Sequence, residues 1–279
     1  MADEPENDPL AALRAPLLYH VDGMETIAPR RIEYRQTRDG YLPMDVYTPP
    51  NLASSDRRPA ILFIHGGPVP PELPPATEWG VYRGYGALAA ASGWVGVTFQ
   101  HRFHSASETS EFDLLEQAEQ DITAAIAHVR DHASELQVDA ERLCLWAFSG
   151  GGPFLARAIR ERPAYLRCLV AYYALMDVRP MATPEERASF SAMARLTAFS
   201  PVAAVNPGSP PILVARAGED HPDLNATLDA FVQVALTQNR LLEVLTHPHG
   251  QHGFDTRDDV PRTREIITRT LEFVRERFA

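Results

Sequence analysis

The chain has 279 residues and a formal net charge of −11, from 26 Lys and Arg residues against 37 Asp and Glu residues. This acidic balance argues against nucleic acid or an anionic membrane surface as the main partner. The acidic first residues lack the basic and apolar regions of a signal peptide, and no run of about 18 apolar residues occurs. We therefore expect a soluble, cytoplasmic protein with one sizeable core and no membrane partner.

The first part of the chain predicts an arm and a hairpin. Residues 1–30 mix acidic, proline and apolar residues without a sustained period, which predicts an N-terminal arm before a main domain over residues 31–279. We expect the arm to pack on the body through Leu13, Leu17, Leu18 and Tyr19. Residues 31–48 predict a hairpin of two half-exposed strands around the turn signal Arg38-Asp39-Gly40.

The rest of the chain alternates short apolar runs with helical patterns. The apolar runs predict buried strands at residues 58–65, 94–99, 143–148, 166–173, 211–216 and 241–246. Helices are expected at residues 82–91, 112–132, 153–162, 223–238 and 263–278. This spacing predicts an α/β fold with right-handed crossovers, in which helices cover both faces of a mostly parallel, doubly wound sheet.

The sequence also contains an insertion that interrupts this alternation and two cysteines within the predicted strands. Residues 176–207 interrupt the rhythm and predict a small lid insertion, with a polar helical segment at 184–198 that carries Glu185, Glu186 and Arg187. Cys144 and Cys168 lie in apolar runs and are expected to be reduced thiols in the core. No Cys and His spacing indicates a zinc site.

A strand, a sharp turn and a helix meet at Ser149. The apolar run before it and the helical pattern from Pro153 place the serine at the apex of the turn. Small residues two before and two after the serine, here Ala147 and Gly151, relieve crowding and leave the hydroxyl exposed. This arrangement predicts a nucleophile elbow, although a flexible Ser-Gly turn would have a similar composition.

A serine hydroxyl needs a base and a group that orients the base. Asp220 follows one later strand and His252 follows the last, and loops at the carboxyl edge of a doubly wound sheet converge on one crevice. Glu219 and Asp223 are the alternative acids, and Asp223 also suits a helix N-terminus. His247 and His249 are the alternative bases, but His252 alone has Gly-x-His-Gly-Phe surroundings.

With these motifs the sequence resembles the α/β-hydrolases, in particular the serine esterase and dienelactone-hydrolase-like group, from about residue 31 to the end. His65-Gly66-Gly67-Pro68 is similar to the family's oxyanion loop, although Pro68 stands where many esterases have a third glycine. Alanine also replaces the first glycine of the elbow. The resemblance implies oxyanion donors at Gly150 and at one of Gly66 and Gly67, since Pro68 has no N–H to donate.

The resemblance also implies a function: hydrolysis of short or compact acyl esters of small molecules through a triad of Ser149, Asp220 and His252, without a metal or organic cofactor. His65 is expected to orient the oxyanion loop, and Arg102 to form a structural ion pair. The expected substrate-binding side chains are Pro68, Trp79, Tyr82, Phe103 and Phe148. An exopeptidase or amidase with the same triad and a non-catalytic binding protein of this fold are the alternatives, and a homo-oligomer is possible.

Overall fold

The computed structural model describes residues 13–38, 40–104 and 111–279. The predicted turn residue Asp39, the first 12 residues of the predicted arm and Ser105 lie outside these ranges. The chain forms an eight-stranded sheet in the order β1-β2-β4-β3-β5-β6-β7-β8. Its strands are β1 (Arg30–Thr37), β2 (Gly40–Tyr47), β3 (Arg58–Ile64), β4 (Val95–Phe99), β5 (Val138–Phe148), β6 (Leu166–Tyr172), β7 (Ile212–Ala217) and β8 (Leu242–His247).

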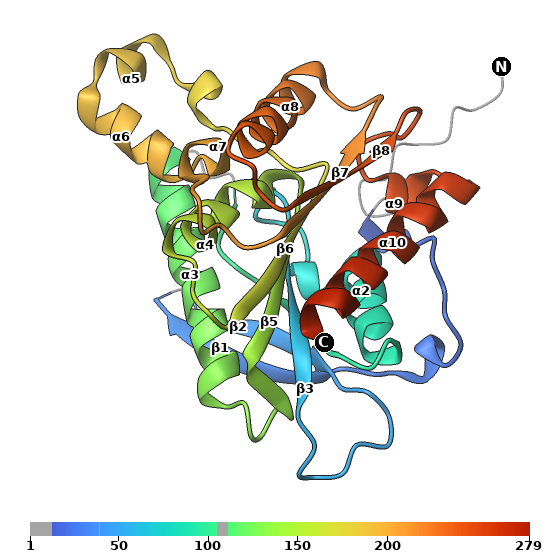
Figure 1. The fold of residues 1–279 in the computed structure, drawn as a ribbon. Coiled ribbons are helices and arrows are strands. Elements are labelled where there is room, and N and C mark those ends of the chain that lie inside the picture. Colours follow the sequence, from blue (N-terminus) through green and yellow to red (C-terminus); the bar gives the residue numbers. More distant parts are fainter. Residues whose placement is uncertain (1–12, 39, 105–110) are drawn as a thin grey trace, which may run out of the picture.

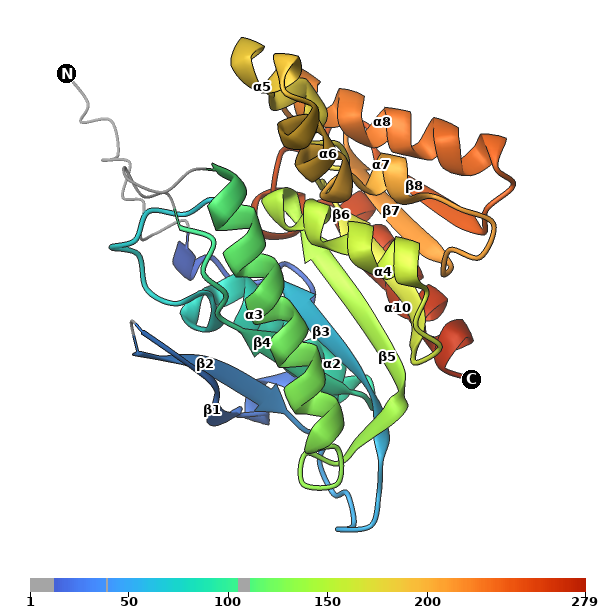
Figure 2. The same cartoon turned by 90° about the vertical axis from the view of Figure 1, so that its left-hand side faces the viewer.

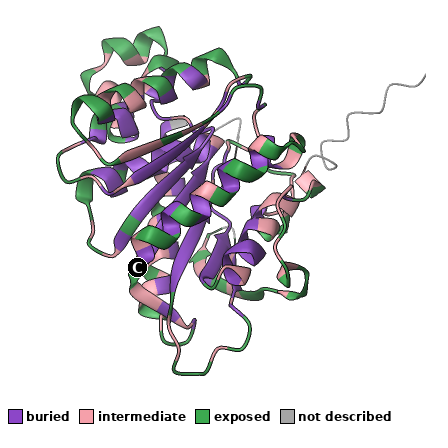
Figure 3. Ribbon diagram, turned by 45° about the vertical axis from the view of Figure 1, so that its right-hand side comes forward, coloured by how far each residue is buried: buried purple, intermediate pink, exposed green. Residues whose placement is uncertain are grey.

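The sheet is mostly parallel, as the alternation of strands and helices predicts. β1 and β2 form the predicted antiparallel hairpin, and β2 also runs antiparallel to β4. From β4 through β8 every neighbouring pair is parallel. The central strands are buried on both faces, and the burial colouring of Figure 3 shows this layer enclosed by helices. Parallel strands of this kind present their carboxyl ends at one edge, where ligand-binding crevices form.

Helices cover both faces of the sheet (Figures 1 and 2). One face packs against α3 (Glu111–Asp131), α4 (Leu155–Glu161) and α8 (Pro222–Thr237), and the other against α2 (Gly80–Ala91) and α10 (Pro261–Phe278). Within β3, Leu62 belongs to the first core and Phe63 to the second, because successive strand side chains point to opposite faces. No helix among the described residues is both long and apolar enough to cross a membrane.

An insertion follows β6 and stands above the carboxyl edge of the sheet (Figure 1). It contains η4 (Arg179–Met181), α5 (Pro184–Ala188), α6 (Phe190–Ala198) and α7 (Pro201–Ala204). The predicted helical segment at 184–198 is therefore split in two, because Ser189 ends α5 and caps α6 by accepting the N–H of Ala192. The insertion is less polar than predicted on its outside: Phe190 is 92% exposed.

The described part of the N-terminal arm packs against α2 and against the segment that follows β8. Leu17 is buried beside Gly84 of α2, where a Cβ would lie 2.6 Å from the Cβ of Leu17. The N–H of Leu18 donates to the carbonyl oxygen of Asp255 at 2.8 Å. Asp255 lies in the short helix α9 (Phe254–Arg257), so the arm reaches the loop that carries the predicted catalytic histidine.

Cys144 of β5 and Cys168 of β6 are register partners in the sheet, and both are free and fully buried, which confirms that they are core thiols.

Candidate active site

Ser149 lies at a sharp turn between β5 and the segment η3 (Ser149–Phe154), which leads into α4. Its φ of 52° is in the left-handed region, where a non-glycine residue is held by the surrounding structure at a cost of about 1–3 kcal/mol. A Cβ at Gly151 would lie 2.8 Å from the carbonyl oxygen of His65, so glycine is required there. Ala147 is fully buried, and its methyl group is accommodated in the core. The predicted strand, turn and helix are confirmed.

Asp220 and His252 are in direct contact. Asp220 follows β7, His252 follows β8, and Asp220 Oδ2 lies 2.7 Å from His252 Nδ1. The other carboxylate oxygen, Oδ1, accepts the backbone N–H of His221 at 2.6 Å. The Asp220 side chain is 3% exposed, whereas the imidazole is 39% exposed. A carboxylate at Nδ1 favours the tautomer with hydrogen on that nitrogen, which leaves Nε2 free to accept a proton.

The alternative acids and bases are placed elsewhere. Glu219 Oε1 lies 3.2 Å from Nδ1 of the exposed His249, and the side chain of Asp223 is 95% exposed. His247 is buried, with its Nε2 3.3 Å from the hydroxyl of Thr263. Within the described ranges, no group of three or more His, Cys, Asp or Glu side chains is arranged to hold a metal ion. Asp220 and His252, the acid and the base that the sequence favoured, are thus the two that contact each other.

Tyr173, directly after β6, connects the serine to the histidine. Its ring centroid lies 4.9 Å from that of His252 and 6.1 Å from that of Phe148, the residue before Ser149. Two residues further on, the N–H of Leu175 donates to the carbonyl oxygen of Ser149 at 2.9 Å. The end of β6 thus packs against both the turn at Ser149 and the loop that carries His252, at the carboxyl edge of the sheet.

The loop after β3 approaches the serine closely. A Cβ at Gly66 would lie 2.8 Å from Ser149 Cβ and 3.2 Å from its Oγ. A Cβ at Gly150 would lie only 1.9 Å from the carbonyl oxygen of Gly67 and 3.0 Å from its nitrogen. Glycine at these positions lets the two backbones meet, and the N–H of Gly150, in the first turn of η3, has no partner within that segment.

Hydrogen bonds fix which way the oxyanion loop faces. His65 Nδ1 donates to the carbonyl oxygen of Gly66 at 2.7 Å. Complete burial lowers the pKa of His65 to about 4, so the imidazole is neutral at pH 7. The carbonyl of Gly66 and the N–H of Gly67 belong to one trans peptide and point in opposite directions. His65 therefore turns the N–H of Gly67 away from itself.

The structure distinguishes between the two glycines that the sequence left open. The N–H of Gly66 donates to Tyr82 Oη at 3.2 Å and is already used. This corrects the inclusion of Gly66 among the candidate oxyanion donors: its N–H is bound to Tyr82, and its carbonyl oxygen accepts from His65. Gly67 and Gly150 are the two donors that the geometry favours.

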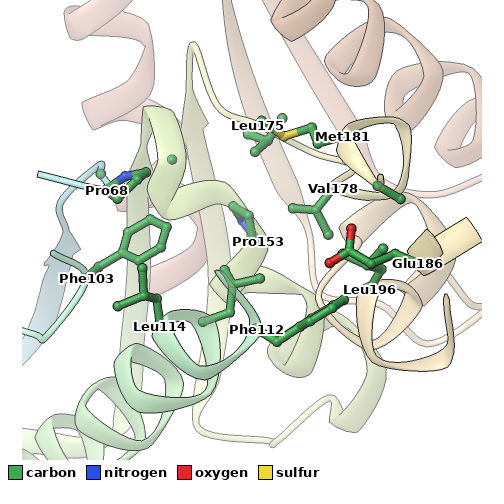
Figure 4. A pocket seen from close by; sticks show the side chains of 14 residues that line it. Pro68, Phe103, Phe112, Leu114, Pro153, Leu175, Val178, Met181, Glu186 and Leu196 are labelled. Atoms are coloured by element: carbon green, nitrogen blue, oxygen red, sulfur yellow. The ribbon is translucent and has the colours of Figure 1, made fainter. Parts of the chain in front are cut away.

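An apolar cavity of about 120 Å³ begins at this loop and extends under the insertion. In Figure 4, Pro68 and Phe103 line one side, while Glu186 and Leu196 of the insertion line the opposite side. The carboxylate of Glu186, which also accepts the N–H of Thr183 at 2.7 Å, is the charged group among the described lining residues. The lining is formed by Gly67, Pro68, Phe103, Phe112, Leu114, Leu115, Gly150, Pro153, Leu175, Val178, Met181, Ala182, Glu186 and Leu196.

Two of the five predicted substrate contacts, Pro68 and Phe103, line this cavity. Trp79, Tyr82 and Phe148, which were also expected to contact the substrate, do not line it. Tyr82 and Phe148 are buried in the core under α2 and α10, on the other face of the sheet, and Trp79 packs against that core. Phe148 follows Ala147 in β5 and so points to the opposite face from the cavity.

The sequence analysis missed the walls contributed by α3 and the insertion. Phe112, Leu114 and Leu115 were visible only as part of a helical stripe, and Val178 and Leu196 lie in a segment whose charged residues made it look polar. Arg102, in contrast, forms the expected structural ion pair: its Nε and Nη2 donate to Asp121 at 2.9 and 3.0 Å.

The chain is similar to several known proteins. Residues 44–158 match the family model described as BD-FAE. Dipeptidyl-peptidase 4 of Giardia intestinalis is 29% identical over 153 residues, which cover 52% of this chain and 19% of that protein. This chain therefore spans about a fifth of that relative's length.

Solved structures of a thermophilic esterase from Thermogutta terrifontis, Est2, share the fold. The native form has a TM-score of 0.75 at 20% identity, covering 95% of this chain and 96% of the other. The propionate-bound form has a TM-score of 0.71 at 21% identity, covering 91% and 94%. With the eight-stranded sheet and the elbow at Ser149, these matches show that the chain has the α/β-hydrolase fold.

Proposed function

We propose that the protein is a serine carboxylic-ester hydrolase that acts on short or compact acyl esters. The observation that carries this proposal is the 2.7 Å contact between Asp220 and His252 at the same sheet edge as the strained turn of Ser149. These are the three groups that acyl transfer needs: a nucleophile, a general base and an orienting acid.

In the proposed reaction, His252 Nε2 takes the proton of Ser149 as Oγ attacks the acyl carbon. Asp220 holds the imidazole in the required tautomer and stabilises the imidazolium that forms. The tetrahedral intermediate collapses when His252 gives the proton to the departing alcohol, leaving an acyl-enzyme. Water then attacks the acyl carbon, His252 takes one of its protons, and transfer of that proton back to Ser149 Oγ releases the carboxylic acid.

The N–H groups of Gly67 and Gly150 are the proposed donors to the negative oxygen of each tetrahedral intermediate. Two observations support this role. The backbones of Gly67 and Gly150 approach each other closely, and His65 donates a hydrogen bond to the carbonyl oxygen of Gly66. Donors that are fixed before the reaction cost no reorganisation when the charge develops, and removing one donor lowers kcat by about 10²- to 10³-fold in other enzymes.

The apolar cavity is the proposed site of the acyl group, because it begins beside the proposed oxyanion donors. Its walls come from stiff or helical segments, so its volume sets the length of chain that it can bury. The structurally similar Est2 has been solved with propionate and with butyrate, and short acyl groups suit the cavity here as well.

A peptidase or amidase reaction is the second candidate, favoured by the match to dipeptidyl-peptidase 4 over about half of this chain. A panel of nitrophenyl esters from acetyl to palmitoyl, measured beside aminoacyl nitroanilides, separates the two. The proposal predicts that kcat/KM is highest for a short acyl ester. A higher kcat/KM on an anilide than on any ester would indicate a peptidase or amidase instead. The absence of any Ser149-dependent turnover would indicate a non-catalytic binding protein. The cytoplasmic location and homo-oligomer stay predictions from the sequence.

A further inference from the structure

A buried carboxylate that the proposed reaction does not use lies three residues after His252. Asp255 is fully buried at the start of α9. Tyr85 Oη donates to its Oδ2 at 2.7 Å, and Tyr173 Oη donates to Oδ1 and Oδ2 at 2.9 and 3.1 Å. An isolated carboxylate is costly to bury, so a site that supplies these donors is built to hold one.

The two tyrosines have different surroundings. The ring of Tyr173 packs on His252, with centroids 4.9 Å apart and the planes inclined at 61°. The ring of Tyr85 packs instead on Trp146 and Phe148, at 5.0 Å from each. Burial raises the pKa of both tyrosines well above the usual value, so both stay protonated and donate. Of these two tyrosines, Tyr173 is the one whose hydroxyl links Asp255 to a ring that contacts the imidazole.

We propose that Asp255 is a positioning residue for His252, which acts by holding Tyr173 against the imidazole. The inference rests on the proposed esterase function. The backbone of Asp255 is itself fixed, because its carbonyl oxygen accepts the N–H of Leu18 from the N-terminal arm. The histidine loop is thus anchored from the arm and from the core.

Titratable side chains surround both Asp255 and His252. Asp220 contacts His252 directly, and Tyr173 packs on it. Asp255 is surrounded by the hydroxyls of Tyr85 and Tyr173, with Tyr82 and Tyr172 interacting at longer range. All four tyrosines are neutral. Burial raises the pKa of Asp255, and the hydrogen bonds from Tyr85 and Tyr173 oppose that rise, so these two hydroxyls are what holds the carboxylate in place.

The test compares Tyr173→Phe with Tyr85→Phe, because each removes one buried tyrosine hydroxyl from the same carboxylate. Both variants keep the aromatic ring. We expect Tyr173→Phe to lower kcat for a short nitrophenyl ester by about tenfold with KM unchanged within about twofold, as expected for an effect confined to the transition state. Tyr85→Phe should keep at least about half of the wild-type kcat. Thermal unfolding of both variants reports the loss of stability that they share.

Asp255→Asn gives the second measurement. An amide offers one oxygen where the carboxylate offers two, so Tyr173 is held less firmly, and kcat for the short nitrophenyl ester should fall by about threefold or more with KM unchanged within about twofold. Equal losses of kcat in the two tyrosine variants, or a wild-type kcat in a folded Asp255→Asn, would overturn the inference. If Asp255→Asn does not fold, the tyrosine pair alone decides. Ester turnover is first compared between the wild type and Ser149→Ala. If the two do not differ, the esterase proposal has failed, and this failure is distinguished from a failure of the inference about Asp255.

Discussion

Replacing Asp220 by Asn should inactivate the enzyme through the tautomer of His252. In the wild type, Oδ1 accepts the backbone N–H of His221 and Oδ2 accepts from His252 Nδ1. An asparagine has one oxygen for these two donors. The backbone N–H of His221 cannot change, whereas an imidazole can move its proton, so the amide oxygen stays on His221 and the amide NH₂ faces Nδ1.

The consequence is an imidazole with its hydrogen on Nε2, which cannot accept the proton of Ser149. We expect kcat to fall by about 10⁴, or about 5.5 kcal/mol of transition-state stabilisation. The assay is steady-state hydrolysis of nitrophenyl acetate and butyrate at pH 7 to 8, with circular dichroism to confirm that the fold is unchanged.

The matched controls are Glu219→Gln and Asp223→Asn, which remove neighbouring carboxylates from the same loop. Both side chains are more than half exposed, and exposed carboxylates contribute little, so kcat should stay within about twofold of wild type. An Asp220→Asn enzyme that keeps a tenth of the wild-type kcat, or an Asp223→Asn enzyme that loses more, would refute this assignment of the acid.

Four further outcomes follow from the oxyanion loop and the cavity. Gly150→Ala would place a Cβ 1.9 Å from the carbonyl oxygen of Gly67, so kcat should fall by about 10²-fold or more; a loss of less than threefold would contradict the donor assignment. Wild-type kcat/KM should peak at an acyl chain of about two to four carbons, since each methylene left unburied loses about 0.8 kcal/mol. Leu196→Ala should move the peak to longer chains, and a wild-type maximum at about eight carbons or beyond contradicts this pocket. Burial lowers the pKa of His65 from 6.5 to about 4, so the unfolded chain binds the proton more tightly and stability is lost as pH falls from 6.5 towards 4. Urea unfolding at pH 4.5 and 7 should show a deficit of about 2–3 kcal/mol from this group that His65→Asn removes, and an equal pH dependence in that variant contradicts it.

The sheet and the triad could be predicted because each rests on a local pattern with a direct physical meaning. Short apolar runs between helical stripes leave one arrangement of strands and crossovers, and Ser149, Asp220 and His252 each follow a strand at the same edge. The conformation needed at Ser149 was also legible, since small residues flank it on both sides.

The cavity could not be predicted in the same way, because its walls come from segments far apart in the sequence. Leu114 of α3 and Leu196 of α6, 82 positions apart in the sequence, line the same cavity only in the folded chain. Phe148 was expected to contact the substrate, but strand alternation turns it to the opposite face of the sheet. The sequence analysis did not single out Asp255, because its hydrogen-bond partners are two tyrosines from distant segments, α2 and the end of β6.

The central claim, that Ser149 is the nucleophile, is tested most directly by covalent labelling. An organophosphonate should add one label per chain of the native enzyme, and peptide mapping should place it on Ser149. Ser149→Ala should fold normally, take up no label and lose about 10⁶ in turnover. A label on another residue, or ester turnover in Ser149→Ala close to that of the wild type, would contradict the account.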